Sequence, residues 1–222
     1  MEIIYGTHNK SKIEAMKRIL KKYKYDIRII TPGDIGFDKE IIENGKTFEE
    51  NSEIKAREIK RYCDSNNIEN IIIITDDAGL CVEKLNGEPG IYTARYAGEK
   101  PTQLENINKL LDNLKPYTDM EDRSCKLVCV LTAILPSGKI IVSRGESAGS
   151  IAFKPGKLGG LTYSPVFIPK GFDKPMGEME EKEYLAVSNH RDVAMHELMK
   201  KIIENGDIQF AQKDCNYRQN DI

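Results

Sequence analysis

The chain of 222 residues has no tryptophan, only three histidines and a formal net charge of −2. It therefore lacks the basic excess typical of a nucleic-acid-binding surface, and we expect no nucleic-acid partner. A few well-placed cations would still suffice to bind a small anion. No apolar run approaches membrane-spanning length, and the sequence starts on a strand-like segment without a signal peptide. These features predict a cytoplasmic protein with no membrane partner.

The sequence also lacks the cysteine spacings that are typical of zinc sites and disulfide frameworks. The number of cysteines is odd, and they form neither a CxxC motif nor a Cys/His pattern, so we predict no zinc site and no disulfide framework. We interpret them as small buried hydrophobic residues in a reducing compartment. The five are Cys63, Cys81, Cys125, Cys129 and Cys215.

Hydrophobic periodicity predicts an α/β layered fold. Strand-like and helix-like segments alternate along the first third of the chain, and two strands joined by a "PSGK" turn follow later. A capping box of Thr47 with Glu50 is expected to start the second helix. Gly206 is expected to end the last helix, which divides the chain into a domain of residues 1–206 and a polar C-terminal tail of residues 207–222. The expected strands cover 2–5, 26–31, 71–75, 125–136 and 140–153, and the expected helices include 13–23, 47–66, 102–115 and one ending near 205.

The stretch "IIIITDDAGL" at residues 71–80 runs four isoleucines into Asp76 and Asp77. A continuous apolar run is typical of a strand buried on both faces, and we expect it to end at the aspartates. Ligands of open α/β sheets bind beyond the carboxyl ends of strands. Two adjacent carboxylates repel each other, and a divalent cation relieves this; oxygen ligands favour Mg²⁺ over zinc. The alternative is that one aspartate caps a turn and the other is solvated.

Two further segments carry candidate ligand-binding residues. "THNKSK", residues 7–12, leads into a helix N-terminus, where free N–H groups, the helix dipole, Lys10 and Lys12 could bind phosphate, although neither a Walker A nor a GxGxxG spacing is present. An ordinary capped turn is the alternative. His190 and Arg191, in "SNHRDVA", could contact a nucleobase or phosphate, or form a surface pair. Tyr163 could stack on a base or pack a turn.

The order of these motifs resembles the inosine/xanthosine triphosphate pyrophosphatase family. The matching segments are "THNKSK", "NGKTFEENSEIKA", "TDDAGLCVEKLNGEPGIYTARYAGE", "GGLTYSPVFIPKG", "EMEEKE" and "HRDVA". They extend from residue 3 to about residue 200, and the block of residues 75–99 is the most specific. The resemblance implies an elongated mixed β-sheet flanked by helices, two lobes with a central substrate cleft, and a homodimer. The implied reaction is Mg²⁺-dependent hydrolysis of ITP, dITP or XTP to the monophosphate and pyrophosphate, which cleans the nucleotide pool.

The same resemblance implies roles for individual residues. Asp77 would be the catalytic residue that takes a proton from water and contacts Mg²⁺, with Glu43 as a second metal carboxylate and Asp76 as a further metal partner. Ala78 would lie next to the substrate. The implied triphosphate cradle is Thr7, His8, Asn9, Lys10, Ser11 and Lys12. The segment implied to hold the base includes Leu161, Thr162, Tyr163 and Ser164, and Lys182, His190 and Arg191 match residues that contact base and phosphate.

Two segments depart from the family pattern, and both lie on the base side. "GLTYSP" stands where relatives read "GFGYDP", and "SNHR" stands where they read "SHR", with a longer stretch from Lys182 to His190. A different base preference with the same chemistry is therefore one alternative. A phospho-acceptor signalling domain also has an acidic pair after a buried strand, and a nucleotide-binding protein without catalysis is a third alternative.

Overall fold

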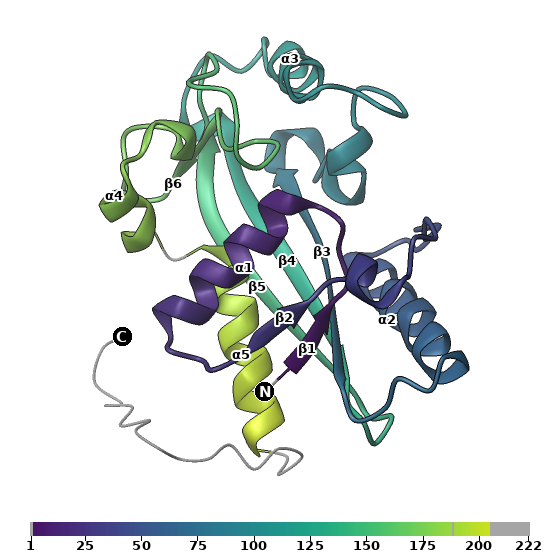
Figure 1. Ribbon diagram of the computed structural model, residues 1–222. Coiled ribbons are helices and arrows are strands. Elements are labelled where there is room, and N and C mark those ends of the chain that lie inside the picture. Colours follow the sequence, from purple (N-terminus) through teal and green to yellow (C-terminus); the bar gives the residue numbers. More distant parts are fainter. Residues whose placement is uncertain (1, 188, 205–222) are drawn as a thin grey trace.

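A mixed sheet runs through the whole length of the molecule, and the computed structural model describes residues 2–187 and 189–204 around it (Figure 1). The strands lie in the order β2-β1-β3-β4-β5-β6. β1 pairs in parallel with β2 and β3, and all later pairs are antiparallel. The strands are β1 (Glu2–Tyr5), β2 (Arg28–Ile30), β3 (Ile72–Val82), β4 (Ser124–Ile134), β5 (Ile140–Ile151) and β6 (Phe167–Pro169).

Helices cover both faces of the parallel end of this sheet. The α-helices are α1 (Lys10–Lys22), α2 (Phe48–Ser65), α3 (Gln103–Asn113), α4 (Glu181–Ala186) and α5 (His190–Glu204). Short 3₁₀ helices span Pro32–Ile35, Glu83–Leu85, Gly90–Arg95, Glu121–Arg123 and Met176–Glu178. None of the helices in the described part of the chain is long and apolar enough to cross a membrane.

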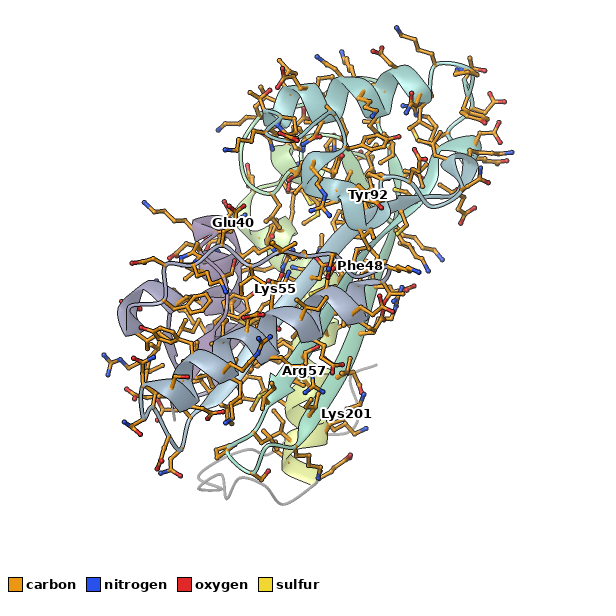
Figure 2. The ribbon with its side chains drawn as sticks, turned by 90° about the vertical axis from the view of Figure 1, so that its right-hand side faces the viewer. Glu40, Phe48, Lys55, Arg57, Tyr92 and Lys201 are labelled. Atoms are coloured by element: carbon orange, nitrogen blue, oxygen red, sulfur yellow. The ribbon has the colours of Figure 1, made fainter. Side chains whose placement is uncertain are left out.

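Alternate residues of the strands supply two separate cores, because successive side chains point to opposite faces. On one face, Ile72 and Ile74 pack with Met16 of α1 and Leu198 of α5. On the other face, Ile73 packs with residues of α2 that include Ala56 and Ile59. Figures 1 and 2 show α2 on the face opposite α1 and α5. The isoleucine run is therefore buried on both sides, as its sequence predicts.

The prediction that this strand ends at the aspartates is wrong. Parallel pairing between β1 and β3 ends at Tyr5 and Ile74, but antiparallel pairing with β4 continues to Val82. The partner strand therefore satisfies the backbone of β3 well past the point where β1 stops. Asp76 and Asp77 lie in the middle of β3, at the place where the sheet loses its parallel neighbour.

A second lobe is built on the far halves of β3, β4 and β5. α3 and β6 pack there around a core that includes Leu80, Ile107 and Phe167. Arg123 joins its parts, because its guanidinium donates to the carbonyl oxygens of Ile151 at 2.8 Å, Leu114 at 3.0 Å and Ala152 at 3.0 Å. The α/β class, the elongated mixed sheet and the two lobes predicted from the sequence are confirmed.

The predictions for individual strands, turns and helix caps are confirmed only in part. The hairpin predicted around "PSGK" is confirmed as β4 and β5, whereas the second strand is shorter than 26–31. Thr47 caps α2 by accepting from the Glu50 N–H at 3.1 Å, but the Glu50 carboxylate accepts from the Lys46 N–H instead of closing a capping box. Among the described cysteines, Cys63, Cys125 and Cys129 are buried and Cys81 is half-buried, all as free thiols. Gly206, Cys215 and the predicted tail lie outside the described residues.

Candidate active site

Asp76 and Asp77 tolerate each other because they point to opposite faces of β3. Successive side chains alternate along a strand, so Asp76 faces α1 and α5 while Asp77 faces α2. Each carboxylate therefore has its own set of partners. This geometry separates two roles that the sequence alone could not distinguish.

Asp76 is completely buried between two cations that come from opposite ends of the chain. Lys12, in the first turn of α1, donates to one carboxylate oxygen at 3.1 Å. Arg191, in the first turn of α5, donates through Nη2 to the other at 3.2 Å. Burial alone would raise the pKa of Asp76, but the charges of Lys12 and Arg191 outweigh it and hold the pKa well below its usual range. Both oxygens thus already bind cations of the chain, and a metal-binding role for Asp76 stays a prediction.

Asp77 has a different environment on the α2 side. Its carboxylate accepts from the Asn51 side chain at 3.2 Å and from the Ala78 N–H at 3.0 Å, and the Lys55 ammonium lies 3.7 Å away. Burial raises the pKa of Asp77; Lys55 opposes this shift and the nearby Glu43 charge adds to it. A carboxylate with a raised pKa in a cleft is suited to accept a proton.

Lys55 and Asn51, which sequence reasoning missed, connect Asp77 to the loop that carries Glu43. The Lys55 ammonium donates to Glu43 at 2.7 Å while facing Asp77. Asn51 accepts from the Gly45 N–H at 2.9 Å while its amide nitrogen donates to Asp77. Both residues are buried on α2 and are four positions apart, which places them on one helix face. The available signal was a polar pair at that spacing in the core-facing stripe of the helix.

Asp77 and Glu43 are the residues that fit a metal ion. Their carboxylates converge on one cation, the Lys55 ammonium, at 3.7 Å and 2.7 Å. Within the described residues no group of three or more His, Cys, Asp or Glu side chains is arranged for a metal. Mg²⁺ is commonly bound by one or two carboxylates together with substrate phosphates. The donor set therefore fits Mg²⁺ with oxygens from a phosphate ligand and does not fit zinc.

The segment of residues 7–12 is a capped turn that opens α1. The Asn9 side chain accepts from the Ser11 N–H at 2.9 Å and the Lys12 N–H at 3.3 Å, and the Thr7 hydroxyl accepts from the Asn9 N–H at 3.2 Å. Asn9 and Lys12 line the cleft that contains Asp77. Lys10 and Ser11 line a neighbouring cavity, and Thr7, His8 and Lys12 line a third one beside Asp76. Four of the six predicted cradle residues thus line cavities that contain Asp76 or Asp77, whereas Lys10 and Ser11 do not.

The first turn of α5 brings His190 and Arg191 into the cleft. Asn189, the extra residue of "SNHR", accepts from the Arg191 N–H at 2.8 Å and so caps this helix. A Cβ on Gly145 of β5 would lie 2.1 Å from the His190 carbonyl oxygen, so the helix start rests directly on the strand backbone. Burial, then the Arg191 charge, lowers the pKa of His190 far below its usual value, so the ring is neutral.

The contact with Arg191 identifies which ring nitrogen of His190 carries the proton. Arg191 Nη1 lies 2.9 Å from His190 Nε2, and since the guanidinium only donates, Nε2 accepts. The proton is therefore on Nδ1, which is buried and has no hydrogen-bond partner in the described part of the chain. His190 lines the cleft. Its Nδ1–H is thus a buried donor without a partner at the edge of the cleft.

Most of the residues predicted on the base side line the cleft. Tyr163 is buried, and its hydroxyl donates to the Thr93 carbonyl at 3.3 Å, so it packs the wall of the cleft. Lys182 is exposed on α4 and is not among the residues that line the cleft, whereas Tyr184 is. The predicted residues that line it are Asn9, Lys12, Glu43, Asp77, Ala78, Leu161, Thr162, Tyr163, Ser164, His190 and Arg191.

Comparisons with known proteins agree with this arrangement. A model of the Ham1 family matches residues 3–201. A dITP/XTP pyrophosphatase of Bdellovibrio bacteriovorus is 38% identical over 204 residues, covering 91% of this chain and 98% of the relative. The enzyme of the same name from Bacillus subtilis strain 168 is 38% identical over 199 residues, covering 90% and 96%.

The fold matches solved structures as well. The Ham1 protein of Staphylococcus aureus superposes with a TM-score of 0.75 at 33% identity, covering 93% of this chain and all of that chain. The Ham1 protein of Coxiella burnetii superposes with a TM-score of 0.76 at 30% identity, covering 92% and 99%. The family predicted from the order of the sequence motifs is confirmed, and the chain belongs to the Ham1 family.

Proposed function

We propose that this chain is a Mg²⁺-dependent nucleoside triphosphate pyrophosphohydrolase that converts ITP, dITP and XTP to the monophosphate and pyrophosphate and so cleans the nucleotide pool. The comparisons confirm the enzyme class, a hydrolase that acts on nucleoside triphosphates. The observation that carries the specific reaction is the division between the two aspartates. Asp76 fixes cations on one face of β3, and Asp77 points its carboxylate to the other face, between Asn51 and Lys55, where it lines the cleft.

The cations around the acidic pair suit a triphosphate. Lys12, Lys55 and Arg191 are held by carboxylates of the chain, so their positions are set before a ligand binds. Preorganised positive charge stabilises the negative charge on phosphate oxygens without reorganisation at the moment of reaction. Hydrolysis at phosphorus depends mainly on such neutralisation and on a positioned water.

Asp77 is the residue placed to accept the proton of that water. Its carboxylate lines the cleft, and Asn51 fixes the orientation of that carboxylate at 3.2 Å. Mg²⁺, held by Asp77 and Glu43, would neutralise phosphate charge and orient the leaving pyrophosphate. The Glu43 loop is kept in place by the hydrogen bond from the Gly45 N–H to Asn51.

His190 supports a preference for a 6-keto purine. Its Nδ1–H can donate to a keto oxygen, whereas the 6-amino group of adenine is a donor at the same place. A donor facing a donor leaves a buried polar group unpaired, which penalises adenine. The altered "GLTYSP" segment lines the same cleft, so a different base preference with the same chemistry is the alternative that the test must separate.

A phospho-acceptor signalling domain has less support than a hydrolase. It would need a separate phosphorylatable aspartate at the end of a later strand, and the sequence offers no clear candidate. A nucleotide-binding protein without catalysis would bind the triphosphates and release no pyrophosphate, and the assay below separates it from a hydrolase. We also propose a homodimer and a cytoplasmic location, on the strength of the family resemblance; light scattering after size-exclusion chromatography and cell fractionation test them.

The experiment is pyrophosphate release with Mg²⁺ from ITP, dITP, XTP, dUTP and the four standard dNTPs. Asp77→Asn should abolish release, while Asp64→Asn, at an exposed position of α2, serves as a matched charge control with full activity. Highest kcat/KM on ITP, dITP or XTP supports the proposal. Preference for another base keeps the chemistry and rejects the substrate assignment. No pyrophosphate from any substrate, or full activity in Asp77→Asn, rejects the reaction.

A further inference from the structure

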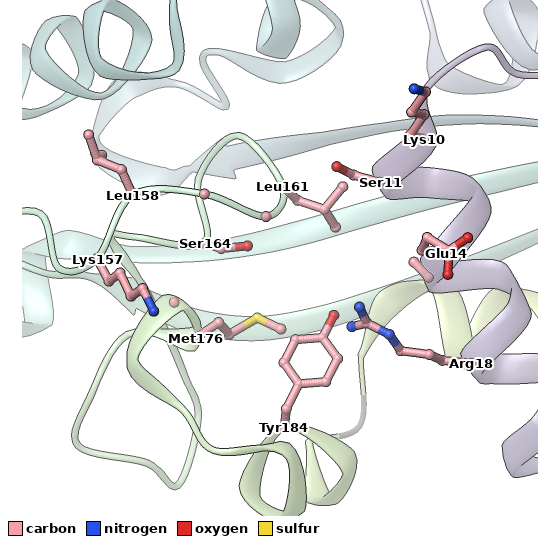
Figure 3. A pocket seen from close by; sticks show the side chains of 14 residues that line it. Lys10, Ser11, Glu14, Arg18, Lys157, Leu158, Leu161, Ser164, Met176 and Tyr184 are labelled. Atoms are coloured by element: carbon pink, nitrogen blue, oxygen red, sulfur yellow. The ribbon is translucent and has the colours of Figure 1, made fainter.

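The loop of residues 157–162 forms the wall between two cavities of the site. Leu161 borders both the cleft that contains Asp77 and the neighbouring cavity against α1, which Lys10 and Arg18 line from the helix side (Figure 3). Gly159 and Gly160 have φ angles of +123° and +69°. Successive glycines in this region give the backbone many accessible conformations. A wall with a fixed shape therefore needs an external support.

Gln103, the first residue of α3, supplies that support from another part of the lobe. Its amide nitrogen lies 3.1 Å from the Gly159 carbonyl oxygen, 3.1 Å from that of Leu161 and 3.2 Å from that of Thr162. Its carbonyl oxygen accepts from the Gly159 N–H at 2.9 Å. One side chain thus binds the loop backbone through both ends of its amide.

The chemistry of these contacts requires an amide. Three acceptors surround the nitrogen end and one donor faces the oxygen end, so the orientation of the Gln103 side chain is fixed by its partners. A carboxylate of the same shape would place an oxygen against three carbonyl oxygens. Gln103 itself lines neither cavity, so it reaches a ligand only through the loop.

We propose that Gln103 is a positioning residue for the nucleotide, and that it sets the shape of the substrate cleft by clamping the loop of residues 157–162. The expected effect on KM rests on the proposed function, whereas the effect of Gln103 on the loop can be measured without substrate turnover. Asp77 lies on β3 and Lys55 on α2, and Lys55 holds Glu43. The hydrogen bonds and ion pairs that fix these three residues do not involve the loop of residues 157–162. Loss of the clamp should therefore weaken binding and leave the chemical step unchanged.

Two substitutions at Gln103 separate the clamp from the stability of α3. Gln103→Ala removes all the contacts. Gln103→Glu keeps the shape, adds a negative charge that favours a helix N-terminus, and opposes the carbonyls. Thr102→Ala is the matched control, because it removes the cap on the Glu105 N–H at 3.2 Å without touching the loop.

Hydrogen exchange followed by mass spectrometry measures the clamp directly. Both Gln103 variants should speed exchange in peptides covering residues 157–164, where the Gly159 N–H loses its acceptor, and Thr102→Ala should not. In the same proteins, both variants should raise KM for the preferred triphosphate about tenfold, with kcat within about twofold of wild type.

The outcomes are distinct. Wild-type loop exchange in Gln103→Glu would overturn the proposal, and so would a control variant that reproduces the Gln103 effects on the loop or on KM. A fall in kcat with unchanged KM would also contradict it. If the wild-type protein hydrolyses no triphosphate, the proposed function fails, while loop exchange still decides whether the clamp exists.

Discussion

Replacing the two neighbouring aspartates one at a time should affect the stability of the metal-free protein differently. Asp76→Asn removes the charge between Lys12 and Arg191 and presents an amide to two donors. Asp77→Asn removes a carboxylate whose pKa is raised by burial, and Lys55 keeps Glu43 as a partner at 2.7 Å. We expect the first variant to be destabilised and the second to be as stable as wild type or more so.

The size of the Asp76 effect follows from burial. The side chains of Asp76, Arg191 and Lys12 are 0%, 5% and 20% exposed. Removing one partner of a buried ion pair costs about 3–5 kcal/mol. Because Lys12 retains contact with water, the cost comes mainly from Arg191, and we expect about 3 kcal/mol. For a domain of this size that corresponds to a fall in Tm of about 6–12 °C.

The pH dependence has a definite sign. The folded pKa of Asp76 lies below the unfolded value of about 3.9, so its stabilisation is present above about pH 4 and is lost as the pH falls towards the folded value. The wild-type protein should therefore lose stability below pH 4 more steeply than Asp76→Asn. For Asp77 the folded pKa is raised, so protonation at low pH favours the folded state.

Urea unfolding followed by circular dichroism, with chelator present and at several pH values, measures both effects. Equal destabilisation by the two substitutions would refute the reasoning, since it would mean that burial and partners do not distinguish them. Wild-type stability of Asp76→Asn at pH 7 would refute it as well.

Three further substitutions test different parts of the structure. Lys55→Met leaves Glu43 and Asp77 without their shared cation, so Tm in chelator should fall by an amount equivalent to about 2 kcal/mol and recover with Mg²⁺ more than wild type does; the absence of any Mg²⁺ response would contradict this. His190→Gln should flatten the fall in unfolding free energy below pH 6.5, which in wild type reaches about 1.4 kcal/mol per pH unit because the unfolded chain alone binds the proton; identical slopes in urea titrations would count against a neutral buried ring. Arg123→Lys should lower the unfolding free energy by about 2–3 kcal/mol with kcat unchanged, because buried carbonyls lose their donors.

Local features of the fold could be predicted from the sequence because their physical causes are local. The isoleucine run of β3 and the turn between β4 and β5 are examples. The end of β3 could not be predicted in this way, because its later backbone groups pair with Val128 and Val130 of β4, about fifty residues further along the chain. Hydrogen-bond partners at that separation leave no mark on the periodicity of the strand itself.

In the site, too, the contacts between residues far apart in the sequence could not be predicted. The turn of residues 7–12 and the acidic pair were recognised from short motifs, but Lys55 and Asn51 acquire their role only because α2 packs over Asp77. Gln103 is an ordinary first-turn helix residue in sequence, and its partners lie more than fifty residues away. Tyr184 rather than Lys182 lines the cleft because the course of the chain through α4, not the motif alone, determines which side chain points inward.

Product analysis in ¹⁸O-labelled water shows which phosphorus atom the water attacks. The preferred triphosphate is hydrolysed with Mg²⁺, and the products are identified by mass spectrometry. We expect a nucleoside monophosphate that carries the ¹⁸O label, together with unlabelled pyrophosphate, and neither product from Asp77→Asn. A nucleoside diphosphate with inorganic phosphate, or ¹⁸O in the pyrophosphate, would contradict attack at the α-phosphorus.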